Sequence, residues 1–243
     1  MQNTATIDRP AREPGGAEVF IPPLENGAHL SACEFLRRFE AMPELKKAEL
    51  IQGIVYMGSP VRTDRHGEPD NLIQTWLGTY AIATPGVKAA ANSTVRLGPD
   101  DVPQPDAFLR ILPDNGGRTA IDDKGYLNGA PELVVEIAAS SASIDTREKL
   151  VSYRRAGAQE YLVWRTEDGE VDWWTLEDDE YRQLPCEETG VICSRVFPGL
   201  RLNPAALLTG NGAKLMDSLQ EGLRSKKHVE FARGLSDNAA SSA

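Results

Sequence analysis

A short apolar run that contains one acid, residues 133–138, constrains the fold of this chain more than any other segment. Pro131 precedes the run and a Ser-rich turn follows it, which is the pattern of a buried strand. Successive side chains of a strand point to opposite faces, and both faces of this run are largely apolar. We therefore expect a strand in the centre of a sheet. Glu136 lies in that strand, and a buried carboxylate requires a cation, hydrogen-bond donors or a proton.

The composition is that of a globular protein. Hydrophobic residues make up 41% of the 243, which permits a sizeable core in one large domain or two small ones. The apolar runs are too short to cross a bilayer, and the N-terminus lacks the plan of a secretion signal, so we expect a soluble, cytoplasmic protein. Three widely spaced cysteines argue against a disulfide framework and a structural zinc site. The net charge of −10 opposes non-specific binding to phosphate backbones.

Three regions of the chain differ in character. Residues 1–17 mix Pro, Gly and charges without periodicity and are expected to form a flexible arm. Residues 18–209 carry the strand and helix patterns of one domain. From residue 210 to 243 we expect a short helix followed by a disordered tail.

The order of elements predicts a mixed α/β domain with one sheet and helices packed against it. A capping box at Ser31 predicts a first helix, and Gly53 predicts a hairpin over residues 48–57. A second capping box, led by Asp145, predicts a helix that ends at Gly157. The other expected elements are a helix around residues 72–80 and strands at 87–97, 106–112, 132–138, 160–165, 170–176, around 181 and at 191–196.

Three residues form a candidate catalytic set. Asp106 follows two prolines and occupies the first position of an expected strand, near the strand that carries Glu136. Two carboxylates supply hard oxygen ligands, which suit Mg²⁺ or Mn²⁺ better than zinc. Lys149 lies near the start of the next helix, where it could orient a metal-bound water, or deprotonate it if burial or the metal lowers the lysine pKa. This set is typical of phosphodiester hydrolysis.

The chain resembles the PD-(D/E)XK nuclease superfamily and, more narrowly, the Uma-two family of restriction-endonuclease-like proteins. The resemblance rests on Pro105-Asp106, on Glu136 near the end of an apolar strand, and on the order helix, three strands, helix, strand. The matching segments extend over roughly residues 30–208. They comprise 48–57, 104–107, 131–137, 145–149, Tyr153, Gly157, 160–161 and 196–199.

The resemblance implies a restriction-endonuclease-like core, in which helices and extra β-hairpins flank a central mixed sheet. It implies a metal ion held by Asp106, Glu136 and the carbonyl of Ile137. The Glu-x-Lys motif of the superfamily would place lysine at position 138, where this chain has Ala138, so the resemblance suggests that Lys149 has taken over the role.

Further expectations concern the surroundings of this set. Glu49 is a candidate additional acid, and His66 is expected to approach the site from the start of a helix. Arg147 and Arg154, two turns apart on one helix face, are candidates for contacting a phosphate, although a solvated face is the more common outcome. Nucleases of this superfamily often pair two active sites across a two-fold axis, so the resemblance also implies a homodimer that binds DNA.

Alternatives remain open at this point. Glu136 is also explained by a buried ion pair with Lys149 or Arg110 and no metal. The leading hypothesis is a Mg²⁺- or Mn²⁺-dependent endodeoxyribonuclease. The acidic balance motivates a second hypothesis, a catalytically inactive nuclease fold used for binding or assembly. A third is a metal-dependent hydrolase of another phosphodiester.

Overall fold

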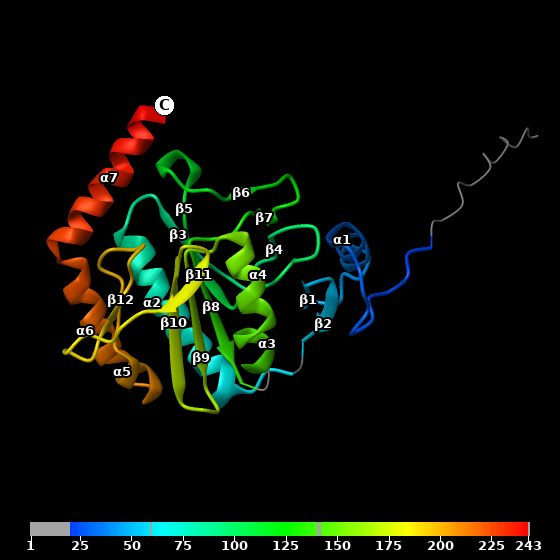
Figure 1. The fold of residues 1–243 in the computed structure, drawn as a ribbon, viewed down its shortest axis with the longest axis horizontal. Coiled ribbons are helices and arrows are strands. Elements are labelled where there is room, and N and C mark those ends of the chain that lie inside the picture. Colours follow the sequence, from blue (N-terminus) through cyan, green and yellow to red (C-terminus); the bar gives the residue numbers. More distant parts are fainter. Residues whose placement is uncertain (1–19, 59, 140–141, 243) are drawn as a thin grey trace, which may run out of the picture.

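A central mixed sheet organises the computed structural model, which describes residues 20–58, 60–139 and 142–242 (Figure 1). The arm expected over residues 1–17 lies outside these ranges. Strands β8 and β9 run parallel, and the other neighbouring strands are antiparallel. In the order in which they pair, the strands are β11 (Glu180–Gln183), β10 (Glu170–Glu177), β9 (Glu160–Arg165), β8 (Leu133–Ala138), β5 (Ala107–Ile111) and β3 (Val87–Ala91).

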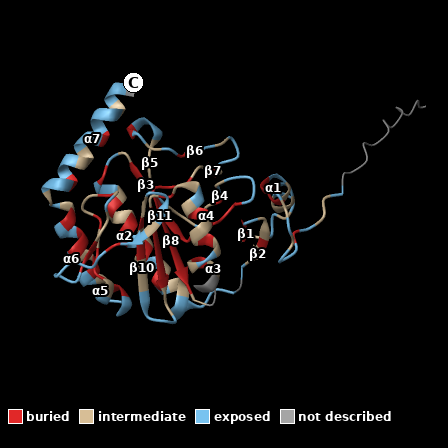
Figure 2. Ribbon diagram, in the orientation of Figure 1, coloured by how far each residue is buried: buried red, intermediate tan, exposed pale blue. Residues whose placement is uncertain are grey.

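Strand β8 is buried on both faces, so the prediction of a central strand is confirmed (Figure 2). Leu133, Val135 and Ile137 pack in the main core with helix α2 (Glu68–Ala83). Val134 and Ala138 point the other way, into a second cluster that contains side chains of helix α4 (Glu148–Ala156). The alternation of side chains along β8 therefore places α2 and α4 on opposite faces of the sheet.

The N-terminal part forms a smaller layer beside the sheet. Ser31 caps helix α1 (Ala32–Glu40) by accepting a hydrogen bond from the Glu34 N–H at 3.4 Å, as predicted. Strands β1 (Ala48–Ile51) and β2 (Ile54–Met57) form the predicted hairpin. Its two-residue turn places Gln52 and Gly53 at φ 52° and 78°, in the left-handed region that glycine tolerates.

The helix expected to start at Asp145 is divided in two. Helix α3 (Ala142–Thr146) contains Asp145, and helix α4 begins after Arg147. The predicted capping role of Asp145 is wrong, because this buried carboxylate lies inside α3 and contacts Lys149 of α4. Gly157 ends α4 at φ 80°, as predicted.

Two expected strands are shorter than their sequence patterns suggest. Residues 87–97 are divided into β3 and β4 (Val95–Arg96), since Asn92 adopts a φ of 50° between them. In residues 191–196 only β12 (Ile192–Cys193) is a strand, because the backbone N–H groups of Arg195 and Val196 turn towards Glu160. The remaining short strands are β6 (Ala120–Ile121), β7 (Leu127–Asn128) and β13 (Arg201–Leu202).

The C-terminal segment forms helices that belong to the main core. These are α5 (Pro204–Leu208), α6 (Gly212–Leu223) and α7 (Lys226–Ser242). Leu215, Leu219 and Leu235 lie in the same cluster as β8, and the side chain of Asn115 donates a hydrogen bond to the Leu235 carbonyl at 2.7 Å. Residues 236–242 are therefore helical, contrary to the expected disordered tail. In the described part of the chain, no helix is long and apolar enough to span a membrane.

Candidate active site

The two predicted metal-binding carboxylates face each other across neighbouring strands. Strands β5 and β8 pair Ala107 with Val135, and continuing this antiparallel register by one residue brings Asp106 opposite Glu136. Asp106 Oδ2 accepts a hydrogen bond from the Ile137 N–H at 2.8 Å, which fixes the aspartate against β8. Asp106 is 3% exposed and Glu136 1% exposed. The structure therefore brings together the acids that the sequence places thirty residues apart.

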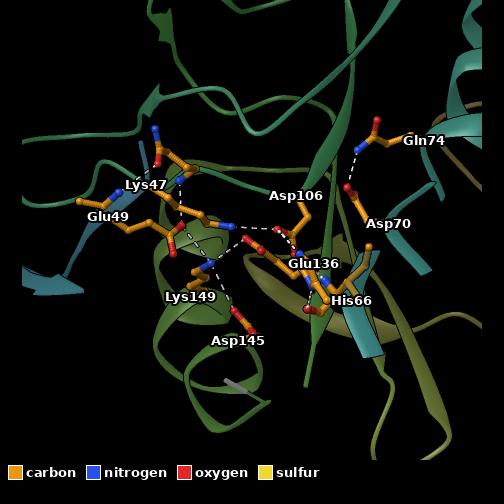
Figure 3. A network of polar contacts seen from close by, with 12 residues as sticks. Lys47, Glu49, His66, Asp70, Gln74, Asp106, Glu136, Asp145 and Lys149 are labelled. Atoms are coloured by element: carbon orange, nitrogen blue, oxygen red, sulfur yellow. Dashed lines mark hydrogen bonds and ion pairs between the residues drawn. The ribbon is translucent and has the colours of Figure 1, made fainter. Parts of the chain in front are cut away.

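Lys149 lies at the centre of the acidic group (Figure 3). Its Nζ is 2.9 Å from Glu49 Oε1, 3.1 Å from Glu136 Oε1 and 3.3 Å from Asp145 Oδ1. Tyr153, one turn further along α4, donates its hydroxyl to the same Glu136 oxygen at 3.0 Å. The hairpin, the sheet and the helices thus converge on one ammonium group, and the predicted inclusion of Glu49 agrees with this geometry.

Lys47 is a member of the site that sequence reasoning missed. It directly precedes β1, and its Nζ lies 2.9 Å from Asp106 Oδ1. No motif marks this lysine. The available signal was its spacing of two residues from Glu49, because alternate residues of an extended segment share one face.

His66 reaches the site from a π-helical turn, Thr63–Gly67, that leads into α2. One ring nitrogen, Nδ1, is 3.1 Å from the Ile137 carbonyl, and the other, Nε2, is 3.5 Å from Asp106 Oδ1. The Ile137 carbonyl, which is expected to bind a metal, therefore lies at the site and contacts the imidazole ring of His66.

The pKa values of the two central acids are shifted in opposite directions. Burial raises the pKa of Glu136 well above its usual value against the effect of Lys149, and the neighbouring carboxylates add to the rise. Burial also acts to raise the pKa of Asp106, but Lys47, Lys149 and His66 outweigh it, so this pKa is lowered. Asp106 is thus held as a carboxylate, while Glu136 is the acid that most needs a further cation.

The pKa of Lys149 is not lowered, as it would have to be for this lysine to act as a general base. Burial acts to lower its pKa, but the attraction of Glu136, Glu49 and Asp145 outweighs burial and raises the pKa well above its ordinary value. The ammonium form is therefore stabilised, whereas a base requires the free amine. This arrangement supports an orienting or charge-stabilising role for Lys149.

A cavity of about 570 Å³ is lined by the ionisable groups of the site: Lys47, Glu49, His66, Asp106, Glu136, Asp145 and Lys149. Arg62 and Arg65 also line it, together with Tyr56 and Met57 of β2. The two arginines expected to contact a phosphate are placed elsewhere. Arg147 is exposed and Arg154 pairs with Glu180 at 2.5 Å, and neither is among the described residues that line the cavity.

The donor set fits a hard divalent cation. Four acids contact the two ammonium groups of Lys47 and Lys149, and with all four ionised the group carries an excess of two negative charges, which one divalent cation would neutralise. Asp106, Glu136 and the Ile137 carbonyl would hold it, and these oxygens are the ligands that Mg²⁺ and Mn²⁺ prefer. Within residues 20–58, 60–139 and 142–242, no group of three or more His, Cys, Asp or Glu side chains forms a ready metal site, so the backbone carbonyl would be needed.

A central mixed sheet flanked by helices, with two acids on neighbouring strands and two lysines in contact with them, is typical of a restriction-endonuclease-like protein. The chain belongs to the Uma2 family, described as "Putative restriction endonuclease", which matches residues 33–205. Membership supports a nuclease-like function on nucleic acid, and such families generally use divalent metals.

The comparison with solved structures agrees on the fold. One match is a "putative nuclease belonging to DUF820" from Anabaena variabilis ATCC 29413. It shares 15% sequence identity with this chain, with a TM-score of 0.53, and the alignment covers 72% of this chain and 97% of the other. The curated proteins include no match to this chain.

Proposed function

We propose that this protein is a Mg²⁺- or Mn²⁺-dependent endodeoxyribonuclease that hydrolyses phosphodiester bonds. The observation that carries the proposal is the placement of Asp106 opposite Glu136, with both acids in one cavity and in contact with lysines. A divalent ion bound there would polarise the scissile phosphate and lower the pKa of an attacking water.

The side chains of the site prepare it for this chemistry. The Ile137 N–H and Lys47 hold Asp106 as an oriented carboxylate. Tyr153 and Lys149 fix one oxygen of Glu136. Lys149 holds Glu49, Glu136 and Asp145 in position through its three contacts. We propose that the protein acts on DNA in the cytoplasm as a homodimer. A strictly monomeric mass by light scattering at micromolar concentration would contradict the homodimer.

The test uses supercoiled plasmid incubated with the full-length protein and Mn²⁺. We expect nicking by the wild type and by Asp114→Ala, which removes an exposed acid outside the cavity, and none by Asp106→Ala. Nicking that persists unchanged in Asp106→Ala would overturn the assignment of the site. A panel of other phosphodiesters separates DNA cleavage from hydrolysis of a different substrate.

One observation favours a second candidate, an inactive nuclease fold used for binding or assembly. Asp106 and Glu136 already contact lysines, as in the ion-pair explanation of a buried acid. The two candidates differ in their response to metal. Millimolar Mn²⁺ should raise the melting temperature of the nuclease and of Asp114→Ala but not that of Asp106→Ala. An unchanged melting temperature for the folded wild type would favour the inactive fold.

A further inference from the structure

The two lysines of the site differ in how many donors remain for a ligand. A lysine ammonium group has three N–H donors. Three carboxylates surround Lys149 within 3.3 Å, and its side chain is only 5% exposed. The number of its protein partners therefore equals the number of its donors, and a substrate would have to displace one of them.

Lys47 is in the opposite situation. In the described ranges its ammonium group contacts one carboxylate, that of Asp106, and its side chain is 35% exposed while lining the cavity. Its aliphatic stem passes Gly58, where an added Cβ would lie 3.6 Å from Lys47 Cβ. With one carboxylate partner for its three N–H donors, the charged end has donors left for a ligand.

The other cations that line the described cavity are less suitable. Arg65 is paired with Glu167 at 2.7 Å, and Asp106 pairs with Lys47 and His66 rather than with Arg62. His66 directs one ring nitrogen at the Ile137 carbonyl. Lys47 alone among them combines direct contact with Asp106 Oδ1 at hydrogen-bonding distance and partial exposure to the cavity.

We propose that Lys47 binds the substrate phosphate, by donating a hydrogen bond to a non-bridging oxygen of DNA, and that Lys149 is a positioning residue. This inference rests on the proposed function, because it takes DNA as the ligand. Lys149 holds Glu49, Glu136 and Asp145 in place, and Lys47 contributes the cation that the phosphate meets beside Asp106. The lysine role that the family resemblance suggests for Lys149 is thus shared between two residues.

The test measures DNA binding without cleavage. Anisotropy of a short fluorescein-labelled duplex is recorded with the full-length protein, without metal, over a series of salt concentrations. We expect Lys47→Met to weaken binding about tenfold and to lower the slope of log affinity against log salt by about one, because one phosphate contact is lost. Lys47→Arg should retain the charge and most of the slope.

The adjacent lysine provides a matched control. Lys46 is exposed and donates to the Pro43 carbonyl at 2.8 Å, so Lys46→Met makes the same change in charge one residue away from the site. We expect its affinity and salt slope to equal those of the wild type. Equal behaviour of Lys47→Met and Lys46→Met would overturn the role of Lys47, and melting curves verify that both variants are folded.

A parallel nicking assay separates this inference from the proposed function. If the wild type cuts plasmid in an Asp106-dependent manner and Lys47→Met cuts with an unchanged KM, the role of Lys47 is wrong and the nuclease assignment stands. If Lys47→Met lowers the salt slope by about one while the wild type cuts nothing, the phosphate contact stands and the nuclease assignment is wrong. A wild-type protein that neither binds nor cuts DNA overturns both.

Discussion

Lys149 Nζ lies 2.9 Å from Glu49 Oε1, and this contact joins helix α4 to the β1–β2 hairpin inside the cavity. Glu49 Oε1 also accepts a hydrogen bond from the Gln104 N–H at 2.8 Å. One carboxylate oxygen therefore connects the hairpin to α4 and to the segment that leads into β5. Elements distant in the sequence depend on it for their relative position.

Replacing this acid should destabilise the fold. Glu49→Ala leaves the buried Gln104 N–H without its acceptor and removes one of the three carboxylates around Lys149, so we expect a loss of about 2–3 kcal/mol in the free energy of unfolding. Urea denaturation measures the loss, and Glu44→Ala, at an exposed position nearby, is the control. A loss no larger than that of the control would contradict the connecting role of Glu49.

Glu136 and Lys149 should respond unequally to neutral replacements. Lys149→Met leaves three buried carboxylates without their shared cation, which should cost about 3–5 kcal/mol. Glu136→Gln should cost much less, because burial already favours the protonated, neutral form of this acid. Adding Glu136→Gln to Lys149→Met should therefore recover stability in chemical denaturation. Additive losses in the double variant would show that the two side chains are not energetically coupled.

Asp101 should control the position of the hairpin relative to α4. Its Oδ1 accepts hydrogen bonds from the Ser152 hydroxyl at 2.6 Å and the Gln52 N–H at 2.8 Å, and its Oδ2 pairs with Arg155 at 2.8 Å. We expect Asp101→Ala to lower stability by about 2 kcal/mol and to speed amide exchange in β1 and β2. The neighbouring Asp100 is exposed, so Asp100→Ala should leave both measurements unchanged. Equal exchange rates in the two variants would refute this role.

Stability should depend on pH through Glu160. Burial raises the pKa of Glu160 from 4.5 to about 7, although donors from Ser194, Arg195 and Val196 oppose the rise. The folded protein holds this proton more tightly than the unfolded chain does. The resulting stabilisation is complete below the unfolded-state pKa and is lost as pH rises through about 7.

The matched variant for this dependence is Glu160→Gln, which cannot titrate. Between about pH 5 and about pH 8, the wild type should lose on the order of 2 kcal/mol relative to Glu160→Gln. Denaturation curves at several pH values measure the difference. A difference that stays constant over this range would place the folded-state pKa of Glu160 near its ordinary value.

Local patterns in the sequence predict much of the fold. The apolar run of β8, the capping box at Ser31 and the turn glycine of the hairpin are properties of adjacent residues, and each specifies its own element. The end of α4 at Gly157 is predicted for the same reason. The order and type of these elements therefore follow from the local sequence without knowledge of the packing.

Features that depend on contacts between residues distant in the sequence could not be predicted from local patterns. Lys47 contacts Asp106 across 59 residues, and no local pattern distinguishes it from the exposed Lys46. The sequence around Asp145 predicts a helix cap, but its carboxylate instead pairs with Lys149 in the site. The polar C-terminal end of α7 is predicted to be disordered because its contact with the domain is not local. The hydrogen bond from Asn115 to Leu235 joins residues 120 positions apart.

The assembly of the site from distant segments has a consequence for folding. Glu49, Asp106, Glu136 and Lys149 come from the hairpin, two strands and a helix that follow one another over a hundred residues. During synthesis Glu49 and Glu136 emerge before Lys149, the lysine that they share, and we expect them to stay hydrated until α4 docks. We therefore expect the desolvation of these two acids to be a late event, because a nascent chain that ends before Lys149 lacks the cation that they share.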